Sequence, residues 1–410
     1  MHDIDSFGRV VLAWGLVGAA ALLAQQLARR MRLPAAALVL VAAAVSATYV
    51  KAVREAVTLH TVENVVTLAL IAILFDGGLH LGRRRFRESA APIVVLGVLG
   101  TFATAALIAV LAHLAFALSW KFSLVLGAAL APTDPAVVFA LLANHENGGR
   151  TSSILQGESG FNDPAGIALL LGFVQLATHP QASAAAMAGT FALSMAVGIT
   201  CGVVGGLALR RLFWTNRRTP QGLQTLAGVL ALYGVTTIAH GSGFLAVLIA
   251  GIVIDSPHVD AAETPSDARQ LTEHFHATLS TLGELVAFVM LGITVNLHTL
   301  FARDVWPIGL AIFGVLAFVI RPAVCAPLLA RLHLTGREIS FISWAGLKGA
   351  VPLLLGALAV SGHVPNSTRL YGIVVVVVFA SVVVQGTSLP FVARRLGIAT
   401  EAAGSDDLSA

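Results

Sequence analysis

The chain has 410 residues, of which 57% are hydrophobic and only 11% are charged. Soluble domains carry roughly 25% charged residues, so this composition excludes an ordinary water-soluble protein. The formal net charge of +4 reflects arginines in predicted loops and gives no indication of nucleic-acid binding. The two cysteines, Cys201 and Cys325, lie in separate apolar segments, which predicts neither a disulfide framework nor a metal site.

Apolar segments long enough to cross a bilayer recur along the chain, and they are continuous rather than alternating, which predicts helices instead of strands. The first begins near Phe7 and is followed, not preceded, by its positive charges Arg29 and Arg30, so we interpret it as a retained helix rather than a cleaved signal peptide. We expect an all-α polytopic membrane protein of about thirteen transmembrane helices, each of roughly 20 residues. The expected ranges are 8–28, 33–50, 62–81, 91–117, 121–143, 152–178, 184–212, 221–239, 243–255, 271–297, 304–331, 337–361 and 367–394.

The distribution of Lys and Arg over the expected loops predicts the orientation. With the N-terminus outside, the inner loops hold 17 of the 25 basic residues and the outer loops hold 6. This asymmetry favours an outside N-terminus, a cytoplasmic C-terminus and an odd number of helices. We expect the polar segment from Asp255 to Thr272 to be a cytoplasmic linker.

Two of the expected helices are interrupted near their middle. Ala131-Pro132-Thr133-Asp134-Pro135 breaks the fifth apolar segment, and Gly346 to Pro352 breaks the twelfth. Paired interruptions in corresponding segments indicate a transporter built from inverted repeats. Thirteen helices divide into six, one linker and six, which places both breaks on the fifth helix of a repeat.

Seven ionisable residues are expected at membrane depth. Each costs about 2.5–3.5 kcal/mol at a helix centre, which sums to roughly 20 kcal/mol unless charges pair, face water or change protonation. The excess of carboxylates predicts a site that holds either a proton or a cation, because burial disfavours an unpaired carboxylate's charged form. The seven are Asp76, Asp134, Glu158, Asp163, Glu284, Arg321 and Lys348.

The helix expected at 152–178 carries oxygen-bearing side chains on two neighbouring faces. Ser159 and Asp163 are four residues apart and share one face, which we predict to bind the cation or proton. Glu158 and Asn162 share the next face. Arg321 is the one arginine expected inside an apolar segment, so we predict that it forms a structural pair with Glu158.

The charges at the two breaks have two interpretations. Half-helices that end at the membrane midplane expose dipole ends, which Asp134 and Lys348 can compensate. Asp134 can instead coordinate the cation, together with the hydroxyl or the main-chain carbonyl of Thr133. For Lys348 we predict the compensating role.

In combination, these motifs resemble the NhaP-type branch of the monovalent cation:proton antiporters, related to the sodium/proton exchangers. The resemblance implies an NhaA-like antiporter fold with two crossing broken helices, and it covers about residues 8 to 395. The motifs that carry it are Thr133-Asp134-Pro135, Gly157-Glu158-Ser159 with Asn162-Asp163, Arg321-Pro322, Gly346-Leu347-Lys348-Gly349 and Leu74-Phe75-Asp76-Gly77-Gly78-Leu79.

The resemblance also implies an organisation and a site. The expected protein is a homodimer in the cell membrane, with no cofactor beyond its transported ions. The implied ion ligands are Asp163, Ser159, Asp134, the Thr133 main chain and Asp76; for Asp76 the alternative is a helix-end carboxylate near the Arg83–Arg87 cluster. The implied domains are a dimerisation domain at 1–90 and 216–303, a core ion-transport domain at 91–180 and 304–396, a linker helix at 181–215 and a short cytoplasmic tail at 397–410.

Within the family, an Asn-Asp pair is typical of electroneutral exchangers, so Asn162 implies exchange of one cation for one proton. Sodium, with lithium, is the expected cation, and potassium is the alternative, because Asp163-Pro164 also occurs in potassium-transporting relatives. The chain departs from many relatives by having Lys348 where they have Arg.

Two classes of intramembrane protease are formal alternatives to antiport. Gly157-Glu158-Ser159-Gly160 and His240 match the serine and histidine motifs of a rhomboid intramembrane protease, and Asp134 with Asp163 could serve as an aspartyl dyad. Neither explains the paired helix breaks, so we expect no enzyme. The histidines, including His145, His258, His274 and His276, are interpreted as solvated loop residues.

Overall fold

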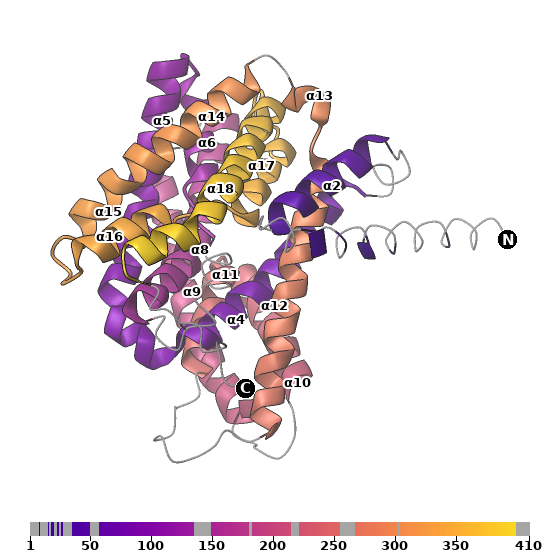
Figure 1. Cartoon of the computed structure of the whole chain (residues 1–410). Helices are drawn as coiled ribbons and strands as arrows, with labels where there is room; N and C mark the ends of the chain where they lie inside the picture. The colour runs from indigo at the N-terminus through magenta and orange to yellow at the C-terminus, as the bar shows by residue number, and fades with distance from the viewer. Residues whose placement is uncertain are drawn as a thin grey trace, which may run out of the picture.

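The structure is a computed structural model that describes residues 35–49, 57–134, 149–179, 183–214, 221–254, 267–301 and 304–398, with a few isolated positions before them. Within these ranges the chain is helical and has no strand (Figure 1). The α-helices are α2 (Ala35–Tyr49), α4 (Leu59–Val94), α5 (Thr101–Phe116), α6 (Trp120–Leu130), α8 (Gly149–Thr178), α9 (Ala184–Leu209), α10 (Gly222–Ile238), α11 (Gly243–Ile254), α12 (Asp267–Thr294), α13 (Leu297–Leu300), α14 (Val305–Val315), α15 (Arg321–Leu329), α16 (Gly336–Trp344), α17 (Ala350–Ser361) and α18 (Ser367–Arg395). Short π-helical segments at Val95–Gly100, Arg210–Trp214 and Leu316–Ile320 continue α4, α9 and α14.

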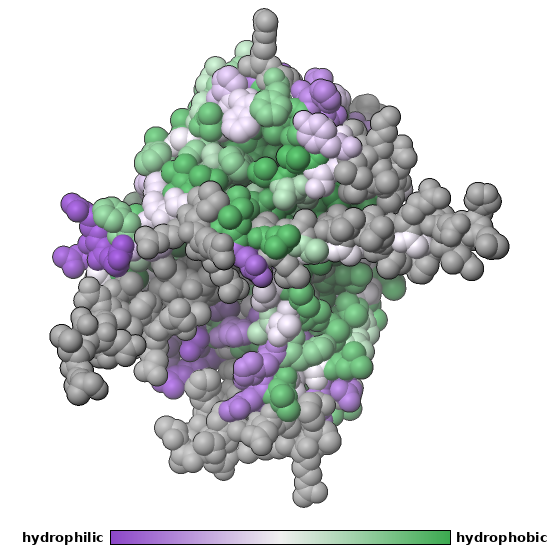
Figure 2. Space-filling model, turned by 45° about the vertical axis from the view of Figure 1, so that its right-hand side comes forward, coloured by the Kyte–Doolittle hydropathy of each residue, from purple (hydrophilic) through white to green (hydrophobic). Residues whose placement is uncertain are grey.

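Six of the described helical stretches are long and apolar enough to cross a membrane. Large apolar side chains remain exposed on them, such as Leu193 on α9 and Phe318 between α14 and α15. Figure 2 shows hydrophobic areas spread over the face in view, with hydrophilic side chains gathered in separate patches. Such a surface suits a lipid solvent, in which helices satisfy their backbone groups internally. The six stretches are Leu59–Phe116, Arg150–Thr178, Ala184–Leu212, Gln270–Thr294, Val305–Leu329 and Ser367–Arg395.

The all-helical prediction is confirmed for the described residues, and helix is found in every expected range from 33–50 to 367–394. The expected first helix at 8–28 lies outside the continuously described part of the chain. The total of thirteen spans and the inverted-repeat relationship stay predictions.

The connection between the expected helices 62–81 and 91–117 is shorter than the sequence suggested. No loop separates them: helix resumes directly after Gly82, whose φ of 60° turns the chain within α4. Glycine adopts this left-handed conformation without a steric penalty, so one residue replaces a loop. The arginines from Arg83 to Arg87 are therefore helical.

The start of α12 corrects two expectations. The helix begins at Asp267, so the residues from Asp267 to Thr272 are helical and not part of a polar linker; residues 255–266 lie outside the described ranges. His276 is 1% exposed on this helix. Its ring packs edge-on against Phe75 of α4, and its Nε2 lies 2.8 Å from the Thr225 hydroxyl of α10. The prediction that it is a solvated loop residue is wrong, because its side chain lies on the face of α12 that packs against α4 and α10.

Helices from the two halves of the sequence pack together in two groups. α12 packs against α2 and α4, and α11 packs against α4, α9 and α10. In the other group α6 packs against α5 and α8, while α18 packs against α14 and α17 (Figure 1). α17 touches α6 and α8 of one group and α4 and α12 of the other, so it lies where the groups meet.

Candidate functional site

The first interruption follows α6. The helix ends at Leu130, and residues from Ala131 to Asp134 leave the helical path; the chain after Asp134 is described again only from 149. Pro132 has no N–H to donate, which favours the end of regular helix at this point. Main-chain carbonyls of the last turn are thereby left without intrahelical partners.

The second interruption separates α16 from α17. Residues from Ala345 to Gly349 are non-helical, and α17 begins at Ala350. The two interruptions touch: the backbone N–H of Asp134 donates to the carbonyl oxygen of Leu347 at 2.8 Å. Two non-helical segments from the two halves of the sequence therefore lie against each other inside the helical bundle.

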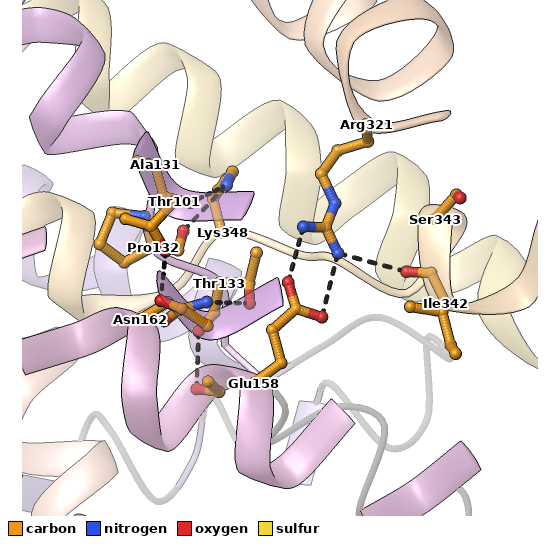
Figure 3. A network of polar contacts seen from close by, with 12 residues as sticks. Thr101, Ala131, Pro132, Thr133, Glu158, Asn162, Arg321, Ile342, Ser343 and Lys348 are labelled. Atoms are coloured by element: carbon orange, nitrogen blue, oxygen red, sulfur yellow. Dashed lines mark hydrogen bonds and ion pairs between the residues drawn. The ribbon is translucent and has the colours of Figure 1, made fainter. Parts of the chain in front are cut away.

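Lys348 is 1% exposed and reaches from the second interruption to the first. Its Nζ donates to the carbonyl oxygens of Ala131 and Pro132, both at 2.9 Å (Figure 3). A cation at the carbonyl end of a helix opposes the negative end of the helix dipole. This is the geometry expected for charge compensation at α6.

The carboxylate of Asp134 lies against Gly349, because a Cβ built on Gly349 would overlap it. Gly349 is the residue before α17, so the carboxylate stands at the N-terminal end of that helix. Negative charge is stabilised there by the helix dipole. The position fits both the compensating and the coordinating interpretation of Asp134.

Helix α8 holds the first interruption through two side chains. The Ser159 hydroxyl donates to the Thr133 carbonyl oxygen at 2.7 Å, and Asn162 Nδ2 donates to Thr133 Oγ1 at 2.7 Å. Asn162, which is four residues after Glu158 on α8, thus contacts the same residue as Ser159 (Figure 3). Both bonds are buried, so Thr133 is fixed by its main chain and its side chain together.

Glu158 points away from Thr133 towards Arg321 (Figure 3). The guanidinium donates to both carboxylate oxygens, at 2.7 and 3.3 Å, and also to the Ile342 carbonyl oxygen at 3.3 Å. Both side chains are almost completely buried, at 1% and 3% exposed. Gly346 allows this approach, since a Cβ there would overlap the guanidinium.

Asp163 lies beside this network and is 4% exposed. Among the described residues its Oδ1 has no hydrogen-bond partner, although it is fully buried. Its charged neighbours are Asp134 and Lys348. Pro164 follows it in α8 and cannot donate the helical hydrogen bond to the Gly160 carbonyl oxygen. A buried carboxylate oxygen without a donor is suited to a proton or a cation.

Asp76 lies on α4 and is paired with His80 one turn later, with Nδ1 and Oδ1 3.3 Å apart. The neighbouring Gly77 carbonyl accepts a 3.1 Å hydrogen bond from Gln156 of α8. No hydrogen bond between described residues joins Asp76 to Asp163, so its assignment as an ion ligand stays a prediction. Glu284 lies on α12 with Asp134 as its charged neighbour.

The motif suggestive of a serine protease does not assemble in the described residues. The Ser159 hydroxyl is engaged with the Thr133 carbonyl, whereas His240 is exposed in the turn between α10 and α11. No described hydrogen bond joins the two side chains.

Two buried residues of this region were not predicted from the sequence. Ser381 and Gln385 of α18 hydrogen-bond to the second interruption, at the Lys348 N–H and the Trp344 carbonyl. The available signal was a pair of polar residues four apart in an apolar helix. The prediction of the site rested on ionisable groups, and these two side chains are neutral.

Two non-helical segments that meet inside a membrane protein, one after α6 and one between α16 and α17, with the carboxylates of Asp134 and Asp163 beside them, are typical of secondary transporters. The comparison with known families then identifies the group. Residues 18–395 match the family described as "Sodium/hydrogen exchanger, transmembrane", and the chain belongs to this family. The resemblance to NhaP-type cation:proton antiporters is thereby confirmed.

Some relatives within the family are named potassium/proton antiporters, and another is named a sodium/proton antiporter. The chain is 34% identical over 337 residues to the K(+)/H(+) antiporter NhaP of Alkalimonas amylolytica, covering 80% of this chain and 57% of that protein. It is 26% identical to the Na(+)/H(+) antiporter ApNhaP of Aphanothece halophytica, covering 82% of this chain and 65% of that protein. The chain thus spans little more than half the length of the first of these relatives.

The fold is shared with a solved structure. The sodium proton antiporter MjNhaP1 from Methanocaldococcus jannaschii superposes with a TM-score of 0.79 at 19% identity, covering 94% of this chain and 99% of that one. At this identity the likeness concerns the fold alone.

Proposed function

We propose that this protein is a secondary active antiporter that exchanges a monovalent cation for a proton by alternating access. The observation that carries the proposal is Asp163: a buried carboxylate with an oxygen that lacks a described donor, beside the crossing of two interrupted helices. Membership of the sodium/hydrogen exchanger family supports the same activity.

The proposed mechanism is competition for one carboxylate. Asp163 binds either a proton or the cation, and the Thr133 carbonyl, the Ser159 hydroxyl and Asp134 supply further oxygens to the cation. Asp76 is the proposed contribution of α4. Because the two substrates exclude each other, movement of the loaded site to either side of the membrane couples their fluxes. Low pH on one side should weaken cation binding on that side.

Four residues are proposed to hold the site without carrying the ion. The buried Glu158–Arg321 pair fixes α8 against α15, and Lys348 stabilises the end of α6. Asn162 orients Thr133 and adds no charge beside Asp163. Of the neighbouring residues Asn162 and Asp163, only Asp163 can bind and release a proton. This supports an electroneutral exchange of one cation for one proton.

The proposed organisation follows the family resemblance. Residues 1–90 and 216–303 form a dimerisation domain, residues 91–180 and 304–396 form the moving core, and 181–215 links them. The protein is proposed to work as a homodimer in the cell membrane, with its N-terminus outside. Crosslinking in native membranes tests the dimer, and reagents that modify cysteines introduced into loops from either side test the orientation.

Sodium is the proposed cation, with lithium as a second substrate. Potassium is the rival, because relatives that are 34% and 30% identical are named K(+)/H(+) antiporters, whereas the relative named for sodium is 26% identical. The oxygen ligands of the site are compatible with either ion.

One assay tests both activity and ion. The purified protein is placed in liposomes whose interior is more acidic than the outside, and a pH-sensitive dye reports the gradient. Addition of the cation outside should dissipate the gradient. Sodium, lithium, potassium and choline salts are titrated in parallel, with protein-free liposomes as the control. A response to sodium and lithium at lower concentration than to potassium supports the first proposal, and the reverse order supports potassium. A protein that retains its fold but gives no response to any of the three metal cations is not the proposed antiporter.

A further inference from the structure

Helix α18 carries two neutral polar side chains in its buried part. Ser381 and Gln385 lie one turn apart and are 0% and 2% exposed, among valines, alanines and leucines. A buried hydroxyl or amide is costly unless it is hydrogen-bonded, so both side chains need partners inside the bundle.

Their partners are backbone groups of the second interruption. The Lys348 N–H donates to Ser381 Oγ at 2.9 Å, and Ser381 Oγ donates to Gln385 Oε1 at 2.6 Å. Gln385 Nε2 then donates to the Trp344 carbonyl oxygen at 2.9 Å. Helix α16 ends at Trp344, so that carbonyl has no intrahelical partner. The two side chains therefore supply hydrogen bonds that the broken helix cannot make for itself.

Helix α8 does the same for the first interruption, through Ser159 and Asn162 on Thr133. In the predicted inverted repeats, α8 and α18 correspond to the last helix of each half. Each interruption is thus held by polar side chains from the helix that ends its own half. The halves differ in chemistry: α8 adds the carboxylate of Asp163, while α18 presents a hydroxyl and an amide.

The hold on the second interruption extends to the first. The same Lys348 whose N–H is bound by Ser381 donates its Nζ to Ala131 and Pro132. Leu347, the residue before it, accepts from the Asp134 N–H. A displacement of the segment around Lys348 therefore moves the carbonyls and the carboxylate of the first interruption.

We propose that Ser381 and Gln385 are positioning residues of the cation site, which they reach through Lys348 and Leu347 without touching the ion. The inference rests on the proposed antiport. It assigns to α18 a share in cation affinity, although α18 contributes no charged ligand in this region.

Ser381→Ala and Gln385→Leu test the proposal. Each removes side-chain hydrogen bonds to a buried backbone group, and each should raise the cation concentration for half-maximal exchange by about three- to tenfold. The maximal rate per folded protein should change much less. The pH at which exchange is half-maximal should shift upwards, since a weakened cation competes less well with the proton. Thr387→Ala is the matched control, because that hydroxyl is exposed and donates only to carbonyls of its own helix; it should leave all three quantities unchanged.

Hydrogen–deuterium exchange gives a readout that does not depend on transport. In Ser381→Ala, peptides covering residues 345–349 and also residues 131–134 should exchange faster than in the parent protein. A variant could lose thermal stability while its half-saturating cation concentration, its pH profile and the hydrogen–deuterium exchange at residues 131–134 stay unchanged. That result would mean that α18 only supports the fold, and it would overturn the proposal. If the parent protein moved no ions, the proposed antiport would be wrong. The hydrogen–deuterium exchange at residues 131–134 would still show whether Ser381 positions the first interruption. If Ser381→Ala does not fold, Gln385→Leu carries the same tests.

Discussion

The backbone N–H of Asp134 donates a 2.8 Å hydrogen bond to the Leu347 carbonyl oxygen, and this bond ties the two interrupted helices directly to each other. Lys348 adds two further hydrogen bonds across the same contact, donated in the opposite direction, from its Nζ to the carbonyl oxygens of Ala131 and Pro132. The crossing is therefore a single unit, in which the geometry of each interruption depends on the other. Substitutions in the second interruption should consequently affect the carboxylate of Asp134 in the first.

Gly349→Ala tests this dependence without changing any charge. A Cβ at this position would overlap the Asp134 carboxylate, which must then move away from the start of α17. We expect cation-driven proton movement in liposomes to fall at least tenfold while the protein still folds.

Gly314→Ala is the matched control for that substitution. Gly314 lies inside α14, and a Cβ added there would meet no neighbouring atom within 4 Å. Alanine at this position should leave exchange intact and raise stability by about 0.5–1 kcal/mol. Equal activity of both alanine variants would show that the position of Asp134 against Gly349 has no part in exchange.

Arg321→Ala should mainly reduce stability. Removing one member of a buried ion pair leaves an uncompensated charge and costs about 3–5 kcal/mol. Arg84→Ala is the control, since the Arg84–Glu88 pair is exposed and such pairs contribute at most about 1 kcal/mol. Melting in detergent should show a large shift for the first variant and a small one for the second. An unchanged melting temperature together with lost exchange would place Arg321 in the ion site instead.

Lys348→Met should also destabilise the protein, for a different reason. The variant leaves the buried carbonyls of Ala131 and Pro132 without their donor, at about 1–3 kcal/mol for each unsatisfied group. Lys348→Arg restores a donor and a positive charge. We expect Lys348→Arg to recover part of the stability and of the exchange activity. If Lys348→Met melted like the parent protein, the two carbonyls would not depend on this side chain.

The extent to which the site could be predicted from the sequence follows from the nature of its parts. Proline and glycine in an apolar segment mark a helix break, and a charge in such a segment needs a partner, so both interruptions and the Glu158–Arg321 contact could be predicted. The sequence does not encode which neutral polar residue meets which backbone group, because this depends on how two helices rotate against each other. Ser381 and Gln385 were missed for this reason, and so was the contact of Asn162 with Thr133.

Local conformation set the other limit. The turn at Gly82 depends on a single positive φ, and hydropathy cannot distinguish that from a loop. His276 was misjudged because polar residues surround it near the start of the expected helix 271–297, whereas its side chain lies on the buried face of α12.

Asn162→Asp tests the stoichiometry. The fold should tolerate it, because an aspartate at 162 can accept from the Thr133 hydroxyl where asparagine now donates to it. An additional carboxylate directly before Asp163 in the chain should make exchange respond to the membrane potential. The potential is set in liposomes with potassium and valinomycin for a sodium-driven assay. Exchange by the parent protein should not depend on that potential. A parent protein that already responds to the potential would contradict the electroneutral proposal.

Asp163→Asn removes the proposed carrier with almost no change in shape. The amide cannot exchange a proton for a cation, so cation-driven proton movement should fall to the level of protein-free liposomes. Stability should be retained or increased, because a neutral group is easier to bury than a carboxylate. Glu88→Gln, which neutralises an exposed carboxylate on α4, should behave like the parent protein. The parent protein should also be stabilised against heat by the transported cation, and Asp163→Asn should not. Exchange that survived in Asp163→Asn would show that another group carries the proton.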